Sequence, residues 1–158
     1  ESSRSIHCGQ SMSKTFFVYQ LLRAGVEIKD IVSVYCSLIR SVLEYNCPVW
    51  HCGLTQAQSA DIEAVQKRVM RILFPHLCYD DALSLAGLEK LSTRREAQVR
   101  SVFADIRCKS NVLNHLLVER PTDERIATIR DAYRYVLPIF KTKRALKSLI
   151  WYCVSRRW

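Results

Sequence analysis

Two adjacent aspartates, Asp80 and Asp81, directly follow the aromatic residue Tyr79. Paired carboxylates can hold the divalent metal ions of phosphoryl transfer when a hairpin presents an aromatic residue, one further residue and two aspartates. The intervening residue is missing here, residues 82–86 have a helical pattern, and no third carboxylate stands on an apolar strand. The sequence therefore favours a first helical turn, where acidic side chains suit the helix dipole, and it predicts no catalytic residue.

The densest group of potential metal ligands is Cys47, His51 and Cys52, with His76 and Cys78 as remote partners. Zinc accepts thiolate and imidazole ligands in a tetrahedron. The paired CxxC spacing of zinc sites is missing, however, so ordinary buried or half-buried cysteines around a turn are favoured. We expect no metal and no other cofactor in this segment.

The third kind of chemistry that the residues offer is the binding of phosphates. The net charge is +9 and is unevenly distributed: residues 1–89 hold 8 basic and 9 acidic side chains, and residues 90–158 hold 16 and 6. Aromatic residues lie among the basic ones beyond residue 132, as a polyphosphate ligand with stackable bases requires. Lys67, Arg68 and Arg71 share one side of a predicted helix and form a compact basic face. The ordinary alternative is a solvated helix surface.

Composition indicates the elements that carry these residues. The chain has 158 residues, 49% of them hydrophobic, with only 4 Gly and 4 Pro, which favours one mainly α domain over a β-sandwich or a disordered chain. The apolar stretch 149–154 is too short to span a membrane. The cysteines are odd in number, at 7, and unpaired in spacing, which favours a reducing, intracellular setting. The polar start without a signal peptide suggests an excised piece.

The hydrophobic periodicity predicts a helical bundle of about six to seven helices, with an irregular or extended segment around 121–142. The expected helices cover 13–24, 28–43, 55–73, 80–86, 92–107, 111–119 and 144–157. The expected organisation is a polar leader over 1–12, a helical domain over 13–119 and a basic aromatic extension over 120–158.

Several residues are predicted to end or begin these helices. Thr55 and Gln58 form a capping-box pattern, and Ser92 is a candidate N-cap. Gly25 and Gly87 are expected to stop the helices before them. Pro48 is expected to end the second helix, because proline disfavours helical geometry at the residue before it.

Five residues near the end of the second helix are expected to be structural: Arg40, Glu44, Tyr45, Pro48 and Trp50. Arg40 and Glu44 are one helical turn apart and can form an ion pair. Tyr45 and Trp50 flank the turn at Pro48, where large aromatic side chains more often pack a junction than bind a ligand. We therefore expect both aromatic residues at the edge of the core.

A long set of ordered residues resembles one known family. The set comprises Tyr35, Leu38-Ile39-Arg40-Ser41-Val42-Leu43-Glu44-Tyr45, Pro48-Val49-Trp50, Ile62-Glu63-Ala64-Val65-Gln66-Lys67-Arg68, Arg71-Ile72, Phe74-Pro75, Tyr79, Ala82-Leu83, Gly87-Leu88, Leu91 and Arg94-Arg95-Glu96. It resembles the region just after the reverse transcriptase palm in polyproteins of non-LTR (LINE-type) retrotransposons. The resemblance covers about residues 15–158 and becomes scattered in the last part.

This resemblance implies the thumb and C-terminal extension of an RNA-directed DNA polymerase, a segment that is not an enzyme by itself. The parent protein would need Mg²⁺, would contain the missing palm, and would bind RNA and DNA, as primer–template hybrid and target DNA, in the cytoplasm and nucleus without a membrane. The residues expected to contact nucleic acid are Lys67, Arg68, Arg71, Arg94, Arg95, Lys141, Lys143, Arg144 and Lys147. The alternatives are a helical protein-interaction module and a decayed retroelement remnant without activity.

Overall fold

The computed structural model describes residues 15–118, 135, 142 and 148–156, and it confirms the mainly α fold. These residues form two compact units. Unit 1 comprises 15–46 and 54–95, and unit 2 comprises 47–53, 96–118, 135, 142 and 148–156. The units divide after residue 95, whereas the sequence predicted a boundary after 119. The predicted leader lies outside the described residues, as does the extended segment apart from its positions 135 and 142.

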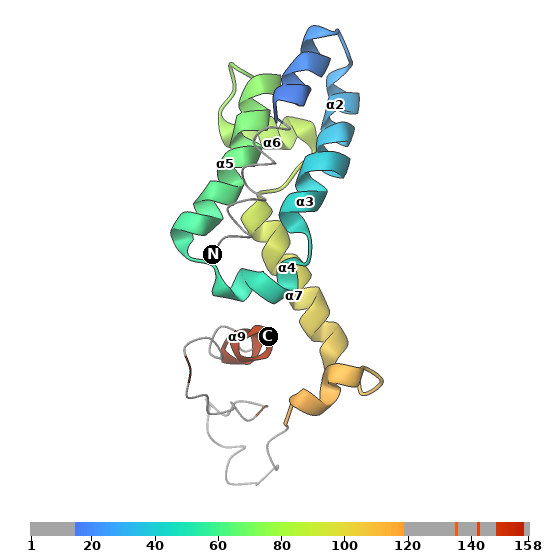
Figure 1. Cartoon of the computed structure of the whole chain (residues 1–158), viewed down its shortest axis with the longest axis vertical. Coiled ribbons are helices and arrows are strands. Elements are labelled where there is room, and N and C mark those ends of the chain that lie inside the picture. The colour runs from blue at the N-terminus through green and yellow to red at the C-terminus, as the bar shows by residue number, and fades with distance from the viewer. Residues whose placement is uncertain (1–14, 119–134, 136–141, 143–147, 157–158) are drawn as a thin grey trace. The chain divides into compact units, whose positions relative to one another are not determined.

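Unit 1 is built from packed helices around one apolar core. Its elements are a helix over 15–23, α2 (Ile28–Tyr35), the π-helical turn η1 (Cys36–Arg40), α3 (Ser41–Glu44), α5 (Gln56–Leu73), α6 (Tyr79–Ala86) and the start of α7 (Leu91–Arg107). Figure 1 shows α5 beside the α2–α3 run, with α6 between them near one end of the unit. The buried core residues are Val18, Ile31, Tyr35, Ile39, Leu43, Val65, Val69, Met70, Leu73, Ala82, Leu83 and Leu91.

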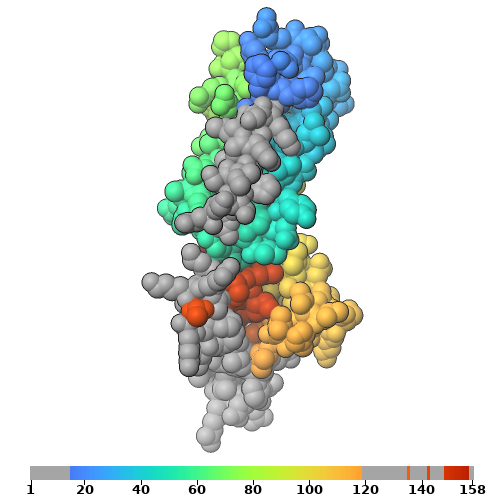
Figure 2. Space-filling model, in the orientation of Figure 1, coloured from blue at the N-terminus to red at the C-terminus, as the bar shows by residue number. Residues whose placement is uncertain are grey.

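The first helix contributes Val18 to this core and leaves Phe16, Phe17 and Tyr19 largely exposed. In Figure 2 the atoms of this helix, in dark blue, lie beside those of the segment that follows α5, in light green. Leu21 and Phe74 both pack against the same core, which agrees with that view. The aromatic residues of the first helix therefore face solvent while its aliphatic residues hold it in place.

The helix predicted over 28–43 is interrupted by the π-helical turn. Its buried residues, Ile31, Tyr35, Ile39 and Leu43, are spaced by four throughout. In a straight α-helix each such step drifts by about 40°, because a turn takes 3.6 residues. The wider turn at 36–40 compensates for this drift and keeps all four on one side. Leu38, which the sequence placed in the core, is half exposed as a result.

The end of this helical run differs from the prediction. Asn46 adopts a left-handed backbone with φ 50°, and a new short helix, α4 (Cys47–Trp50), begins at once. Pro48 lies in the first turn of α4, where its missing N–H costs nothing, so it starts a helix instead of ending one. Tyr45 is 79% exposed, so its predicted place at the edge of the core is wrong, whereas Trp50 is half-buried.

The predicted boundaries of α5 and α6 are confirmed. Thr55 Oγ1 accepts a hydrogen bond from the Gln58 backbone N–H at 3.2 Å, and Gln58 Oε1 accepts from the Thr55 N–H at 3.1 Å, which completes the capping box. Gly87 ends α6 with φ +64°, a backbone conformation that suits glycine.

Unit 2 consists of shorter elements around a second core. Its elements are α4, the 3₁₀ turn η2 (His51–Gly53), the remainder of α7, the 3₁₀ helix η3 (Val112–Leu116) and α9 (Leu149–Ser155). The buried residues that form this second core are Val99, Phe103, Ile106, Leu117, Tyr135, Cys153 and Val154. The helix predicted over 111–119 is the shorter η3, and of the helix predicted over 144–157 the positions 144–147 and 157 lie outside the described residues. Within the described ranges, no helix is long and apolar enough to cross a membrane.

Candidate nucleic-acid interface

A basic face lies on α5 and consists of Lys67, Arg68 and Arg71, all of them exposed. The opposite side of the same helix is buried in the core of unit 1. Side chains three and four residues apart on a helix are neighbours, so the three positive charges form one group. Among the residues that the structure describes, no ion pair joins any of them to a carboxylate. The α5 basic face can therefore present its cations to a polyanion.

Lys67 is held in place by an aromatic ring from the next helix. Its Nζ lies 5.4 Å from the centroid of the Tyr79 ring, at cation–π distance. Tyr79 is the first residue of α6 and is itself fixed by hydrogen bonds. The position of one cation of the face is thus coupled to the packing of α6 on α5.

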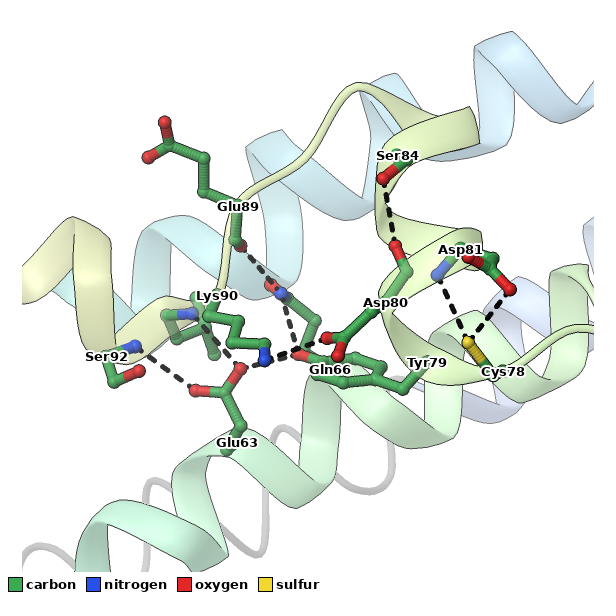
Figure 3. A network of polar contacts seen from close by, with 11 residues as sticks. Glu63, Gln66, Cys78, Tyr79, Asp80, Asp81, Ser84, Glu89, Lys90 and Ser92 are labelled. Atoms are coloured by element: carbon green, nitrogen blue, oxygen red, sulfur yellow. Dashed lines mark hydrogen bonds and ion pairs between the residues drawn. The ribbon is translucent and has the colours of Figure 1, made fainter.

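A network of polar side chains joins α5 and α6 (Figure 3), and Tyr35 extends it to α2. The Tyr79 hydroxyl donates to Glu63 Oε1 at 2.5 Å and accepts from Gln66 Nε2 at 3.0 Å. Gln66 is fully buried; its Nε2 also donates to the Glu89 backbone oxygen at 2.9 Å, and its Oε1 accepts from the Tyr35 hydroxyl at 2.7 Å. Every polar atom of the Gln66 amide therefore has a partner, which makes burial of this side chain tolerable.

Glu63 links α5 to the start of α7. Its Oε1 accepts from the Leu91 N–H and its Oε2 from the Ser92 N–H, both at 3.2 Å (Figure 3). A carboxylate at this place satisfies two of the free N–H groups of a helix N-terminus and suits the helix dipole. The cap of α7 is therefore Glu63, from a different helix, and the prediction of Ser92 as N-cap is wrong.

Burial gives two tyrosines of this network a pH dependence. It raises the pKa of Tyr35 and, with help from the hydrogen bond to Glu63, that of Tyr79. Folding thus favours the protonated phenols, and their contribution to stability is present below the ordinary tyrosine pKa of about 10 and lost above it. We expect the free energy of unfolding to fall above about pH 10 by up to about 1.4 kcal/mol per pH unit for each tyrosine.

Urea denaturation at several pH values between about 9 and 11 measures this fall. Tyr35→Phe should flatten the decline, because it removes one of the two phenols. Tyr45→Phe, at an exposed position, is the matched control and should leave the decline unchanged. An equal slope in Tyr35→Phe and wild type would contradict the prediction.

Arg94, expected at a phosphate, is engaged inside unit 1. Its Nε lies 2.7 Å from Glu44 Oε1 and its Nη2 3.2 Å from Glu44 Oε2, a two-point ion pair between α7 and α3. This pair takes the place of the predicted one between Arg40 and Glu44. Arg94 is therefore a structural residue, and its guanidinium does not belong to the exposed basic surface.

Arg95 is buried, with 0% of the residue exposed, and its Nη2 donates to Ser59 Oγ at 2.7 Å. The prediction that Arg95 contacts a phosphate is therefore wrong. Leu91, Arg95 and Val99 follow one another at intervals of four and are all fully buried. This spacing places Arg95 on the apolar stripe of α7, a signal that the sequence contained. The remaining predicted contacts, Lys141, Lys143, Arg144 and Lys147, lie outside the described residues.

The acidic pair after Tyr79 occupies the first turn of α6, as the sequence favoured. Asp80 Oδ1 forms an ion pair with Lys90 Nζ at 2.8 Å, and Asp81 accepts from the Cys78 thiol at 3.0 Å. Cys78 is the N-cap of α6, since its sulfur accepts from the Asp81 N–H. Both carboxylates thus take part in local contacts at a helix start.

The candidate zinc ligands lie in ordinary packing. Cys47 is buried in α4, and the His51 ring packs edge-on against that of Tyr152 at 5.9 Å. Cys52 is half-buried, and burial raises the pKa of its thiol to about 11. In the described part of the chain, no group of three or more His, Cys, Asp or Glu residues is placed to hold a metal ion.

No protein-family model matches the chain, and neither a curated protein nor a solved structure does so. The class that the fold defines is a basic, mainly α protein with two compact units.

Proposed function

We propose that this chain is a non-catalytic segment of a LINE-type reverse transcriptase polyprotein and helps to hold the RNA–DNA primer–template. The observation that carries the proposal is the α5 basic face, where Lys67, Arg68 and Arg71 are exposed together. The resemblance of the ordered residues between Leu38 and Glu96 adds the class of parent protein. Catalysis and its Mg²⁺ belong to the missing palm in this proposal.

The residues that carry the resemblance divide into two sets in the structure. Tyr35, Ile39, Leu43 and Val65 are buried in the core of unit 1 and build the helical scaffold. The cations of the α5 basic face belong to the same ordered set but are exposed. A scaffold that fixes an external row of cations is what a segment needs if its task is to hold a nucleic acid.

The mechanism is electrostatic. Lysine and arginine side chains that neutralise phosphates release condensed counterions, and this release favours binding. Such contacts hold and orient a strand without reading its bases. With Arg94 and Arg95 engaged inside unit 1, the described residues expected to act in this way are the three of the α5 basic face.

The salt dependence of binding tests the proposal. Replacing Lys67, Arg68 and Arg71 together by alanine removes three phosphate contacts. The slope of log affinity against log salt should become less negative by roughly 2 for a single strand and by roughly 2.7 for a B-form duplex, and a hybrid is expected to fall within this range. Fluorescence anisotropy with a labelled RNA–DNA hybrid measures the slope, and circular dichroism checks that the helical content is retained.

A matched control removes the same charge elsewhere. Arg23, Lys29 and Lys109 are also exposed, and their triple alanine variant has the same net charge as the test variant. If the control reduces the slope as much as the test variant does, binding depends on net charge alone and the proposed interface is wrong. A wild-type slope near zero would refute nucleic-acid binding by this chain.

The exposed aromatic residues of the first helix favour a second candidate, a protein-interaction module. Phe16 is 62% exposed, and Phe17 and Tyr19 beside it are each more than 40% exposed. Large exposed apolar groups can mark contact with another protein. A protein-interaction module should have little affinity for nucleic acid, so the anisotropy experiment on the wild-type chain distinguishes this candidate function from the proposed one.

A further inference from the structure

Unit 2 has a shallow hollow on α7 that none of the sequence predictions included. Arg100, Phe103, Ala104 and Arg107 line it, and its volume is about 260 Å³. These positions are three, four and seven residues after the first, a spacing that places side chains on one side of a helix. Two arginines therefore flank Phe103 and Ala104 along this side of α7.

The charges around the hollow are positive in sum among the described residues. Arg100 Nη2 lies 3.1 Å from Glu96 Oε1, and Nη1 of Arg156, which directly follows α9, lies 3.7 Å from the same oxygen. One carboxylate is thus shared by two guanidiniums, and Arg107 adds a third positive charge. Arg156 is also stacked over the Tyr152 ring at 4.5 Å, which fixes its direction.

The shape and charge of this hollow suit a phosphate group. The planar guanidinium fork matches phosphate oxygens in a two-point arrangement, and two such forks can approach one ligand from both ends. Phe103 and Ala104 offer no side-chain hydrogen-bond acceptor that would compete for those donors. We propose that Arg100 and Arg107 bind a backbone phosphate of a polynucleotide in this hollow. The choice of a polynucleotide rests on the proposed function, but the residues differ from those of the α5 basic face.

Glu96 acts on this site as a positioning and competing group. Its carboxylate holds Arg100 and repels an incoming phosphate, so its loss should strengthen binding. Glu96→Gln is accordingly expected to raise the affinity for a polynucleotide several-fold. If Glu96 only ties α7 to α9 within unit 2, the same change would lower stability without a gain in affinity, and the site would be refuted.

The test uses the full chain and a labelled single-stranded RNA in anisotropy titrations at several salt concentrations. Replacing Arg100 and Arg107 by alanine should make the salt slope less negative by about 0.7, which corresponds to the loss of one single-strand phosphate contact. The exposed pair Arg23 and Lys29, replaced by alanine, is the charge-matched control and should change the slope less. Equal slopes in these two double variants would refute the site.

A lysine variant keeps the test valid if the alanine variant loses its fold. With Lys at positions 100 and 107 the charge is retained and the fork is lost, so affinity should fall several-fold at unchanged helical content. Affinity equal to that of wild type would refute the two-point geometry.

Two further comparisons identify the ligand and separate this site from the α5 basic face. Inorganic phosphate and a mononucleotide should compete with the RNA only weakly; if they bind through Arg100 and Arg107 while the RNA does not, the polynucleotide assignment is wrong. If the double variant weakens RNA binding and the triple variant of Lys67, Arg68 and Arg71 does not, this site stands and the α5 interface fails. The reverse pattern refutes this site and leaves the α5 interface intact.

Discussion

Replacing Glu63 by alanine is expected to lower the free energy of unfolding by about 2–4 kcal/mol. The Glu63 carboxylate accepts from Tyr79, Leu91 and Ser92, and two of these donors stand at the N-terminus of α7. Leu91 is fully buried and Tyr79 is half-buried. Without the Glu63 carboxylate, the Leu91 N–H and the Tyr79 hydroxyl therefore have little access to water as a replacement acceptor. Each buried donor left without a partner costs about 1–3 kcal/mol. Urea denaturation followed by circular dichroism measures the loss.

Two further variants show whether the loss comes from this network. Glu63→Gln keeps one acceptor oxygen and removes the charge, so its free energy of unfolding should fall by about half as much as that of the alanine variant. Glu89→Ala removes an exposed carboxylate. It keeps the hydrogen bond from Gln66, because the acceptor of that bond is the backbone oxygen of residue 89. The free energy of unfolding of this surface variant should stay within about 0.5 kcal/mol of that of wild type. Equal losses in Glu63→Ala and Glu89→Ala would show that the network does not hold unit 1 together.

The features predicted well from the sequence depend on residues close together in the chain. Thr55 and Gln58 are three residues apart, and their capping box forms as expected. Gly87 directly follows the last helical residue of α6, where only a glycine-like conformation fits. The first-turn place of Asp80 and Asp81 is equally local, because the helix dipole acts within one turn.

The features that were missed depend on residues far apart in the chain. Glu44 and Arg94 are separated by 50 positions, and Glu63 and Leu91 by 28, so no local pattern could pair them. The π-helical turn at 36–40 is a different case. The sequence shows apolar residues at uniform intervals of four at 31, 35, 39 and 43, and the structure buries all of them. The ordinary α-helical template accommodates the same residues, so the π-helical turn was not predicted.

The candidate site shows the same division. The α5 basic face follows from helical periodicity alone, and the structure leaves Lys67, Arg68 and Arg71 exposed. Arg94 and Arg95 were both assigned to the surface, although the spacing of Leu91, Arg95 and Val99 indicated a place for Arg95 on the apolar stripe; in the structure Arg94 forms an ion pair and Arg95 is buried. Periodicity thus indicates which side of a helix is apolar, but whether an arginine forms an ion pair with another helix, as Arg94 does with Glu44, depends on tertiary packing.

Arg94→Ala is the second large change that we expect, with a loss of about 2–4 kcal/mol in the free energy of unfolding. The Glu44 side chain is only 10% exposed and that of Arg94 33%, so removing the arginine leaves the more deeply placed charge without its guanidinium. Glu44→Ala should cost less, because the Arg94 side chain can turn toward water. A double-mutant cycle with both alanine changes measures the interaction energy of the pair directly.

The same variant decides between a structural and a phosphate-binding arginine. If Arg94 serves unit 1 through Glu44, then under conditions where Arg94→Ala remains folded its salt slope for hybrid binding should equal that of wild type. A phosphate-binding Arg94 would instead make the slope less negative by about 0.7–0.9, one contact's worth, with little loss of stability. The matched control variant is Arg23→Ala, because Arg23 is exposed and lies in the same unit as Arg94. A stable Arg94→Ala protein with a reduced slope would return this residue to the interface and would show that its ion pair with Glu44 opens when nucleic acid binds.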